Sequence, residues 1–337
     1  MGRAIQVGMI GAGRIGTLHA EHLAHRIPDA RLIAVADIVQ EAAERCAARF
    51  DIPVAVQDYR AILEDEKIEA VASCSSTDTH TQIIEDAARA GKQIFCEKPI
   101  AFDLARLDRA LDAVRQAGVK LQIGFNRRFD ANFRRIRDAV ADGRIGTPHI
   151  LRITSRDPAP PPIEYVRVSG GIFLDMTIHD FDMARYIIGS EVEEVYAVGG
   201  VMVDPTIGEA GDIDTTIITL RFENGVLATI DNSRQAVYGY DQRVEVFGSK
   251  GMIAAQNNTA DRTVVSDTEG VHSALPLYFF VERYADSYIA ELQAFVRCVQ
   301  EDTPPPVTGL DGRVPVVMGY AARTSYEQGR PVRLDEV

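Results

Sequence analysis

The sequence has few cysteines, no long apolar run and no excess of basic residues. Cys46, Cys74, Cys96 and Cys298 are scattered without CxxC spacing, which argues against a structural zinc site and against a disulfide framework. No apolar stretch approaches the roughly 20 residues of a membrane-spanning helix. The net charge of −13 leaves little basic surface for nucleic acid or an anionic membrane. We therefore expect neither class of partner.

An apolar leader is also missing, because the first residues, MGRAIQVGMIGAG, pass directly into a strand pattern. We therefore expect a cytoplasmic protein whose cysteines stay reduced. A content of 46% hydrophobic and 25% charged residues is ordinary for a globular protein. The 337 residues exceed the size at which one hydrophobic core usually stops growing, so two domains are expected.

Residues 5–16, IQVGMIGAGRIG, place a short apolar run directly before three glycines, and helical spacing follows. In such a strand–turn–helix unit Gly11 makes the turn, Gly13 lets the backbone approach a pyrophosphate, and Gly16 allows close packing of helix on strand. The helix N-terminus then offers free N–H groups and a positive dipole end to the phosphates. The pattern predicts a dinucleotide-binding site.

A second apolar strand, RLIAVAD, ends in Asp37, 21 residues after Gly16, where an acid would bind the ribose hydroxyls of the adenosine half. The alternative is a strand-end acid that only caps a turn. A 2′-phosphate about 4 Å from this carboxylate would cost on the order of 4 kcal/mol at an effective dielectric near 20. Neither Ile38 nor Val39 could neutralise it, so NAD is favoured over NADP.

Strands and amphipathic helices alternate up to residue 125, which predicts a parallel sheet covered on both faces. The expected helices are 41–50, 59–68, 80–91 and 104–118, and the expected later strands are 70–76, 92–97 and 119–125. In such doubly wound domains ligands bind beyond the carboxyl ends of the strands. The loops 75–80 (SSTDTH) and 97–99 (EKP) carry polar groups there, where a nicotinamide ring could lie.

Three histidines at spacing three, His19, His22 and His25, have the look of a metal cluster. A helix directs residues six apart in diverging directions, and no acid or cysteine nearby in the sequence completes the ligand set. We therefore predict no metal site, which also argues against zinc-dependent alcohol oxidation.

After residue 125 the composition changes. Residues 148–156 read as a strand, a proline-rich loop follows at 157–165, and antiparallel strands are expected within 192–203, 214–233 and 243–255, with a hairpin turn at Asn224-Gly225. Helices are expected at 284–302 and 312–329. The fold class predicted is α/β: a doubly wound Rossmann domain over 1–125, followed by an α+β domain on a mostly antiparallel sheet over 126–337.

Residues 170–189, GGIFLDMTIHDFDMARYIIG, form an apolar segment that is predicted to be one helix. Asp175, His179 and Asp182 are spaced four and three apart, so they share one helix face and could line a cleft. A carboxylate beside an imidazole fixes its orientation and stabilises its protonated form. The alternative is a helix whose acids are solvated on one side and whose histidine is half-buried and satisfied.

A histidine suits NAD chemistry because oxidation of a secondary alcohol removes a hydride from carbon and a proton from oxygen. If the hydroxyl resembles water, at about 15.7, prior deprotonation by a histidine near 6.5 would be short by about 12 kcal/mol. Proton removal must therefore accompany hydride transfer, and a cation near the oxygen would help. Lys98, at the carboxyl end of a strand, is the candidate; the alternative is a surface lysine before a proline.

The order GxGxxG, an acid after the second strand, CEKP and GGxxxDxxxHDxD resembles the glucose–fructose oxidoreductase, inositol dehydrogenase and rhizopine-catabolism (Gfo/Idh/MocA) family of NAD(P)-dependent oxidoreductases. The resemblance covers essentially the whole chain, and GFNRRFD, SRDP and GGIFLDMTIHDFDMARYIIG are most similar to its inositol 2-dehydrogenase branch. It implies an open-sheet second domain, often assembled into tetramers through the sheet. It also implies that Lys98, Asp175 and His179 form the catalytic set, with His179 as proton acceptor.

We therefore predict an NAD-dependent dehydrogenase of a cyclic polyol, with myo-inositol oxidised to its 2-keto derivative as the favoured reaction. Arg128, Asp157 and Tyr238 are candidate hydroxyl binders, because each hydroxyl needs donors and acceptors. The predicted cofactor-binding residues are Gly11, Gly13, Arg14, Ile15, Asp37, Ser75, Thr77, His80, Glu97 and Lys98, and the predicted substrate-binding residues are Arg128, Asp157, Asp175, His179 and Tyr238.

Three alternatives remain open. They are another sugar or sugar-derivative dehydrogenase of the same family, an NAD-dependent glycosidase that uses the hydride step transiently, and a non-catalytic NAD-sensing regulator. A regulator would not need Lys98, Asp175 and His179 together, which counts against it.

Overall fold

The computed structural model describes residues 3–337 and divides into two compact units. One contains the chain up to Asn126 together with Asp286–Val314, and the other contains Arg127–Ala285 together with Pro315–Val337. We expected everything after residue 125 to lie in the second domain, whereas residues 286–314 return to the first. The reason is that helix α12 (Ala285–Gln300) buries Leu292, Phe295 and Val296 in the first unit's core.

The first unit is built on a six-stranded parallel sheet in the order β3-β2-β1-β4-β5-β6. Its strands are β1 (Ile5–Ile10), β2 (Ala30–Ala36), β3 (Val54–Val56), β4 (Ala70–Ser73), β5 (Gln93–Cys96) and β6 (Leu121–Ile123). The strand order reverses between β1 and β4, and ligands of doubly wound folds bind beside such a reversal. The predicted Rossmann architecture is confirmed; β3 was not predicted.

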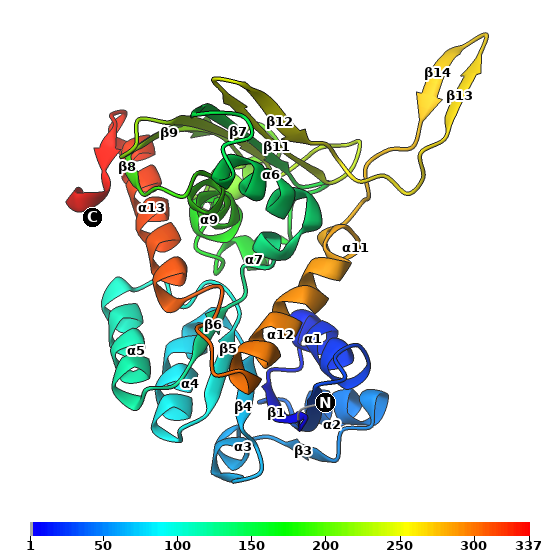
Figure 1. Cartoon of the computed structure of the whole chain (residues 1–337), viewed down its shortest axis with the longest axis vertical. Helices are drawn as coiled ribbons and strands as arrows, with labels where there is room; N and C mark the ends of the chain where they lie inside the picture. The colour runs from blue at the N-terminus through cyan, green and yellow to red at the C-terminus, as the bar shows by residue number, and fades with distance from the viewer. Residues whose placement is uncertain (1–2) are drawn as a thin grey trace. The chain divides into compact units, whose positions relative to one another are not determined.

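Helices α1 (Arg14–His25), α2 (Gln40–Phe50), α3 (Arg60–Glu64), α4 (Thr77–Arg89) and α5 (Leu104–Ala117) connect these strands (Figure 1). The central strands are buried along almost their whole length; all four residues of β4 are buried, for example. A strand covered on both faces must be apolar at every position, which explains its continuous apolar sequence. Helix α3 is shorter than the expected 59–68.

The second unit is built on a seven-stranded sheet in the order β12-β11-β7-β10-β9-β8-β15. Its strands are β7 (Pro148–Arg156), β8 (Val192–Gly200), β9 (Thr215–Phe222), β10 (Leu227–Ser233), β11 (Asp241–Gly248), β12 (Gly251–Ala255) and β15 (Val332–Arg333). Strands β7 and β10 pair in parallel, whereas the remaining neighbours pair antiparallel. The sheet is therefore mostly antiparallel, as expected, with one parallel pairing that local patterns did not reveal.

The helices of this unit include α6 (Ala131–Ala141), α7 (Ile163–Val166), α8 (Ile172–Asp175), α9 (Thr177–Ile188), α10 (Pro205–Glu209) and α11 (Phe280–Arg283), while α13 (Gly309–Gln328) contributes its second half. The predicted single helix over 170–189 was wrong in detail, because the chain breaks at Met176 into α8 and α9. A two-stranded hairpin of β13 (Val264–Asp267) and β14 (Gly270–Ser273), also not predicted, extends away from the large sheet (Figure 1).

No helix within residues 3–337 combines the length and the apolar character needed to cross a membrane.

Candidate functional site

The three glycines after β1 meet different surroundings. Gly11 has φ of +97°, and a Cβ there would lie 2.7 Å from the carbonyl of Cys74. At Gly16 a Cβ would lie 2.0 Å from the Gly11 oxygen, so this glycine permits the close packing of α1 on β1. A Cβ at Gly13 would meet no atom within 4 Å. Open space therefore lies in front of the N-terminus of α1, where a pyrophosphate fits.

Asp37 follows β2 beside this turn. Its Oδ2 accepts the N–H of Ala12 at 2.7 Å, and its Oδ1 accepts the N–H of Val39 at 2.9 Å. These bonds hold the carboxylate against the glycine turn, which suits an acid that binds a ribose. Beside it Ile38 is 83% exposed, an accessible apolar side chain that the sequence analysis did not identify.

The two loops predicted to lie near a nicotinamide meet at His80. The His80 ring is buried, with Nδ1 2.8 Å from the Pro99 oxygen and Nε2 3.1 Å from the Ser75 oxygen. Because both ring nitrogens already face chain carbonyls, His80 supports the loops and does not present a free nitrogen to a cofactor. Thr77 begins α4, and the Ser75 hydroxyl is 2.7 Å from that of Thr79.

Glu97 also points into the protein. Its Oε1 lies 2.7 Å from His19 Nε2, and its Oε2 accepts the backbone N–H of Lys98 at 3.2 Å. Candidate ligand atoms of His19, Glu97 and Glu291 lie within 4.8 Å of one another. Two ligands of one tetrahedral zinc ion would be about 3.3 Å apart. The shorter His19–Glu97 distance is that of a hydrogen bond.

In the second unit, the three aspartates and the histidine of α8 and α9 divide into two pairs. Asp180 and Asp182 are fully buried, whereas Asp175 and His179 are half-buried. Among residues 172–185, only Asp175 and His179 keep part of their surface accessible. The expectation that Asp182 lines a cleft therefore needs correction.

The two buried aspartates are held by arginines that precede α6. Arg127 Nη1 donates to Asp180 at 2.6 Å, and Arg128 donates from Nε and Nη2 to Asp182 at distances from 2.6 to 3.1 Å. Because the Arg128 guanidinium is engaged in this buried pair, it is poorly placed to bind a substrate hydroxyl, in contrast to its predicted role. The sequence could not pair residues 54 positions apart.

Asp175 has two partners that the sequence analysis missed. Tyr165 donates its hydroxyl to Oδ1 at 2.8 Å, and Arg234 Nη1 donates to Oδ2 at 2.9 Å. Arg234 is 2% exposed and also lies 3.9 Å from carboxylate oxygens of Asp157 and Asp212. One buried cation thus faces three acids.

This crowding of acids affects their protonation. Burial raises the pKa of Asp157 to about 6, Arg234 acts in the opposite direction, and the charge of Asp175 raises it further. Burial is also the main reason that the pKa values of Tyr165 and Asp212 are raised. The cluster therefore combines a tyrosine hydroxyl with carboxyl groups whose protonated forms are favoured by burial.

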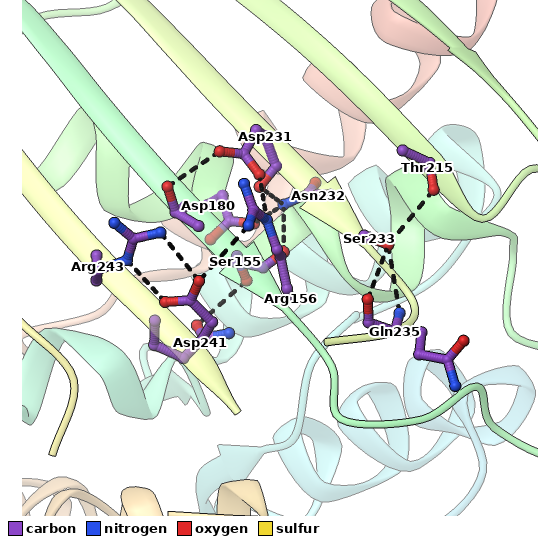
Figure 2. A network of polar contacts seen from close by, with 12 residues as sticks. Ser155, Arg156, Asp180, Thr215, Asp231, Asn232, Ser233, Gln235, Asp241 and Arg243 are labelled. Atoms are coloured by element: carbon purple, nitrogen blue, oxygen red, sulfur yellow. Dashed lines mark hydrogen bonds and ion pairs between the residues drawn. The ribbon is translucent and has the colours of Figure 1, made fainter. Parts of the chain in front are cut away.

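Tyr238 bonds to two residues of a neighbouring polar network on β7, β10 and β11, and Figure 2 shows Arg156, Asp231 and Asp241 of that network from close by. Its hydroxyl donates to Asp241 at 2.6 Å and accepts from Arg156 at 3.1 Å. Arg156 also donates to Asp231 at 2.7 Å, and Asn232 donates to Asp180 at 2.9 Å. These bonds hold the Tyr238 hydroxyl in place. Its contact with substrate stays a prediction.

Chemically, the first unit offers a dinucleotide site and a lysine, while the second offers a carboxylate, an imidazole and hydroxyl-binding groups. The comparisons with known proteins identify the two domains. Residues 5–125 match the model described as "Oxidoreductase family, NAD-binding Rossmann fold", and residues 133–254 match the "GFO/IDH/MocA C-terminal domain".

The chain is 53% identical to a myo-inositol 2-dehydrogenase of Thermotoga maritima, over 99% of both chains. It is 44% identical to an inositol 2-dehydrogenase of Rhizobium meliloti, over 98% of this chain and 99% of that one. A solved structure of scyllo-inositol dehydrogenase from Lactobacillus casei, with bound NAD(H) and scyllo-inositol, is 30% identical, has a TM-score of 0.93 and covers 99% of this chain and 100% of that one. The chain therefore belongs to the Gfo/Idh/MocA family of NAD-binding oxidoreductases.

Proposed function

We propose that this protein is an NAD-dependent inositol 2-dehydrogenase, and that its substrate is myo-inositol, which it oxidises at one ring hydroxyl to the ketone. The observation that carries the proposal is the 53% identity, over 99% of both chains, to the protein named myo-inositol 2-dehydrogenase. The more distant scyllo-inositol dehydrogenase, at 30% identity, makes scyllo-inositol the second candidate.

Bound NAD would supply the acceptor for the hydride. Its pyrophosphate would lie at the N-terminus of α1, in the space that a Cβ at Gly13 would fill, close to Arg14 and Ile15 at the start of that helix. Asp37 would bind the ribose hydroxyls and repel a 2′-phosphate. Ser75 and Thr77 stay candidates for the nicotinamide side, with His80 and Glu97 as supports of the loop.

In the reaction His179 accepts the hydroxyl proton while the hydride leaves the same carbon, so a neutral ketone results. Asp175 orients the imidazole and stabilises its protonated form. Lys98 offsets the negative charge that develops on the reacting oxygen. Asp157 is the best supported hydroxyl binder, because its carboxyl group stands beside Arg234 and is not fully buried.

We further propose a cytoplasmic homotetramer. All four cysteines are buried and unpaired, as expected in a reducing compartment. Five strands of the large sheet expose a large apolar residue on the outward side: Val198, Ile217, Leu227, Phe247 and Met252. Such a face is typical of a subunit interface. Light scattering coupled to size exclusion measures the oligomer.

A substrate screen with the purified protein tests the function. Inositol isomers, glucose, galactose and xylose are each incubated with NAD or NADP while absorbance of the reduced cofactor is followed. We expect myo-inositol with NAD to be the best pair and to give one NADH per ketone, with no loss of rate in a strong chelator.

Other outcomes would identify the alternatives. Faster turnover of scyllo-inositol or of a sugar would change the substrate within the same class. Glycoside cleavage without accumulation of NADH would indicate a glycosidase. NAD binding without turnover of any compound would favour a regulator.

A further inference from the structure

Each chain neighbour of Lys98 is held by a buried histidine from another element of the first unit. His19, on α1, lies 2.7 Å from the Glu97 carboxylate, and His80, on α4, lies 2.8 Å from the Pro99 oxygen. The two histidines are 0% and 1% exposed. A segment fixed on both sides of one residue leaves that residue little backbone freedom.

We propose that His19 and His80 are positioning residues for Lys98, acting through Glu97 and Pro99. We call these four residues the histidine clamp. The inference rests on the proposed function, because it requires Lys98 to act in the reaction. Neither histidine needs to touch substrate or cofactor for this role.

The Glu97 carboxylate is enclosed in a way that suits the clamp. Besides His19 it accepts the backbone N–H of Lys98 itself at 3.2 Å. A Cβ on Gly124 would lie only 3.0 to 3.2 Å from the carboxylate atoms. Glu97 therefore fits a slot that the absence of a side chain at Gly124 creates, and any shift of its carboxylate would be passed to the Lys98 backbone.

Burial favours the neutral form of three titratable groups near His19 and Glu97. Glu291, on α12, is 0% exposed, and its oxygens make no hydrogen bond within residues 3–337; burial first, and the charge of Glu97 second, raise its pKa well above the usual value. Burial lowers the pKa of His22 to about 4 and raises that of the Cys74 thiol. Of the two hydrogen bonds to the Glu97 carboxylate described above, the one to His19 is the shorter, at 2.7 Å against 3.2 Å for the Lys98 N–H, so a change at His19 should shift this carboxylate.

His80 holds Pro99 through the packing of its buried ring and through one hydrogen bond. Burial lowers the pKa of His80, so its ring is neutral at pH 7 and carries a single N–H. The shorter contact, 2.8 Å from Nδ1 to the Pro99 oxygen, is the one we assign to that N–H. The bond joins α4 to the residue directly after Lys98.

A double-mutant cycle tests the clamp in the full chain with NAD and myo-inositol. His19→Ala and His80→Ala are made in the natural sequence and again with Lys98→Met. Hydride transfer is followed in single turnovers with excess enzyme, so that slow variants stay measurable. We expect each histidine change to lower the rate roughly 10- to 100-fold in the natural sequence, the scale of a misplaced catalytic group. With Lys98→Met the same changes should cost less than about 3-fold, because a positioning residue has nothing left to position.

Two further variants separate positioning from a general loss of structure. His22→Ala removes a buried histidine one turn along α1 that does not bond Glu97, and it should leave the rate near normal. His19→Gln restores a donor near the Nε2 position and should recover most of the rate. The dissociation constant for NAD should change less than about 3-fold in all of them, as measured by fluorescence titration.

If the histidine variants fail to fold, Gly124→Ala gives the same test, because its Cβ displaces the Glu97 carboxylate while both histidines remain. A normal rate in folded Gly124→Ala would overturn the proposal. Equal losses with and without Lys98 would overturn it as well. A Lys98→Met protein that retains a normal rate would overturn both the role of Lys98 in the reaction and the clamp built on it, whereas no oxidation of myo-inositol by the natural protein would contradict the proposed function.

Discussion

The proposed site in the first unit is formed mainly by backbone groups, whereas the one in the second unit is formed by side chains. In the first unit the proposed cofactor site consists largely of backbone, namely a turn at Gly11, open space at Gly13 and a helix N-terminus. In the second unit the proposed reactive groups are side chains, and one of them, Asp175, is held by Arg234, which faces three acids. A backbone site depends on a few neighbouring residues, whereas a side-chain site depends on partners far away in the chain.

This difference predicts how each part responds to substitution. A change at the backbone site should alter cofactor affinity and leave the chemistry intact. A change in the charge cluster should alter the chemistry and the protonation of neighbouring groups while cofactor affinity stays constant.

The largest effect is expected at His179. His179→Ala should lower kcat by about 10²- to 10⁴-fold, the usual range for general-base assistance, while NAD affinity stays near normal. Asp175→Asn should also impair catalysis, and the double variant should lose much less than the two free-energy losses combined. The control is His272→Ala, in the exposed hairpin β13–β14. A kcat above about a tenth of the natural value would remove His179 from the base role.

At the backbone site the comparison predicts opposite results for two glycines of one turn. Gly13→Ala should fold normally, because its Cβ meets no atom within 4 Å, but should raise the dissociation constant for NAD about 10- to 100-fold by crowding the pyrophosphate. Gly16→Ala should lower the melting temperature, since its Cβ would lie 2.0 Å from the Gly11 oxygen. Unchanged NAD affinity in Gly13→Ala would contradict a pyrophosphate at this turn.

Arg234 tests the charge cluster directly. Arg234→Lys keeps the charge but loses the planar fork that reaches several acids, so kcat/KM for myo-inositol should fall about 10-fold with NAD affinity unchanged. Arg152→Lys is the matched control, because Arg152 is exposed and pairs with Glu245 in the same unit. If both variants behave alike, Arg234 has no part in placing Asp175.

The smallest effect is a pH dependence of stability at Asp157. Its pKa is raised to about 6 in the folded protein, against about 3.9 in an unfolded chain, so the folded state holds the extra proton between these values. The contribution of Asp157 to stability is therefore complete below about pH 4 and is lost as the pH rises through 6. The melting temperature of Asp157→Asn minus that of the natural protein should therefore be a few degrees larger at pH 7 than at pH 4. The same melting difference at both pH values would contradict the raised pKa.

The sequence by itself determined the architecture of the first unit and indicated the residue types of the proposed chemistry. Apolar strands, amphipathic helices and the GxGxxG turn with Asp37 are local patterns, and a parallel sheet follows from them because each element carries its own burial signal. The spacing of Asp175 and His179 also indicated that these two residues share one face of an otherwise apolar segment.

Only the tertiary structure decided which charges pair. Asp182 and Arg128, 54 residues apart, neutralise each other, although sequence reasoning placed both near substrate. Arg234 and Tyr165 were missed because neither belongs to a local motif, and α12 returns to the first unit because its apolar face fits that core. Periodicity reports that a face is buried, but not what covers it. Charge pairing and helix docking are long-range choices, and they are made only when the packed core brings the partners within a few ångströms.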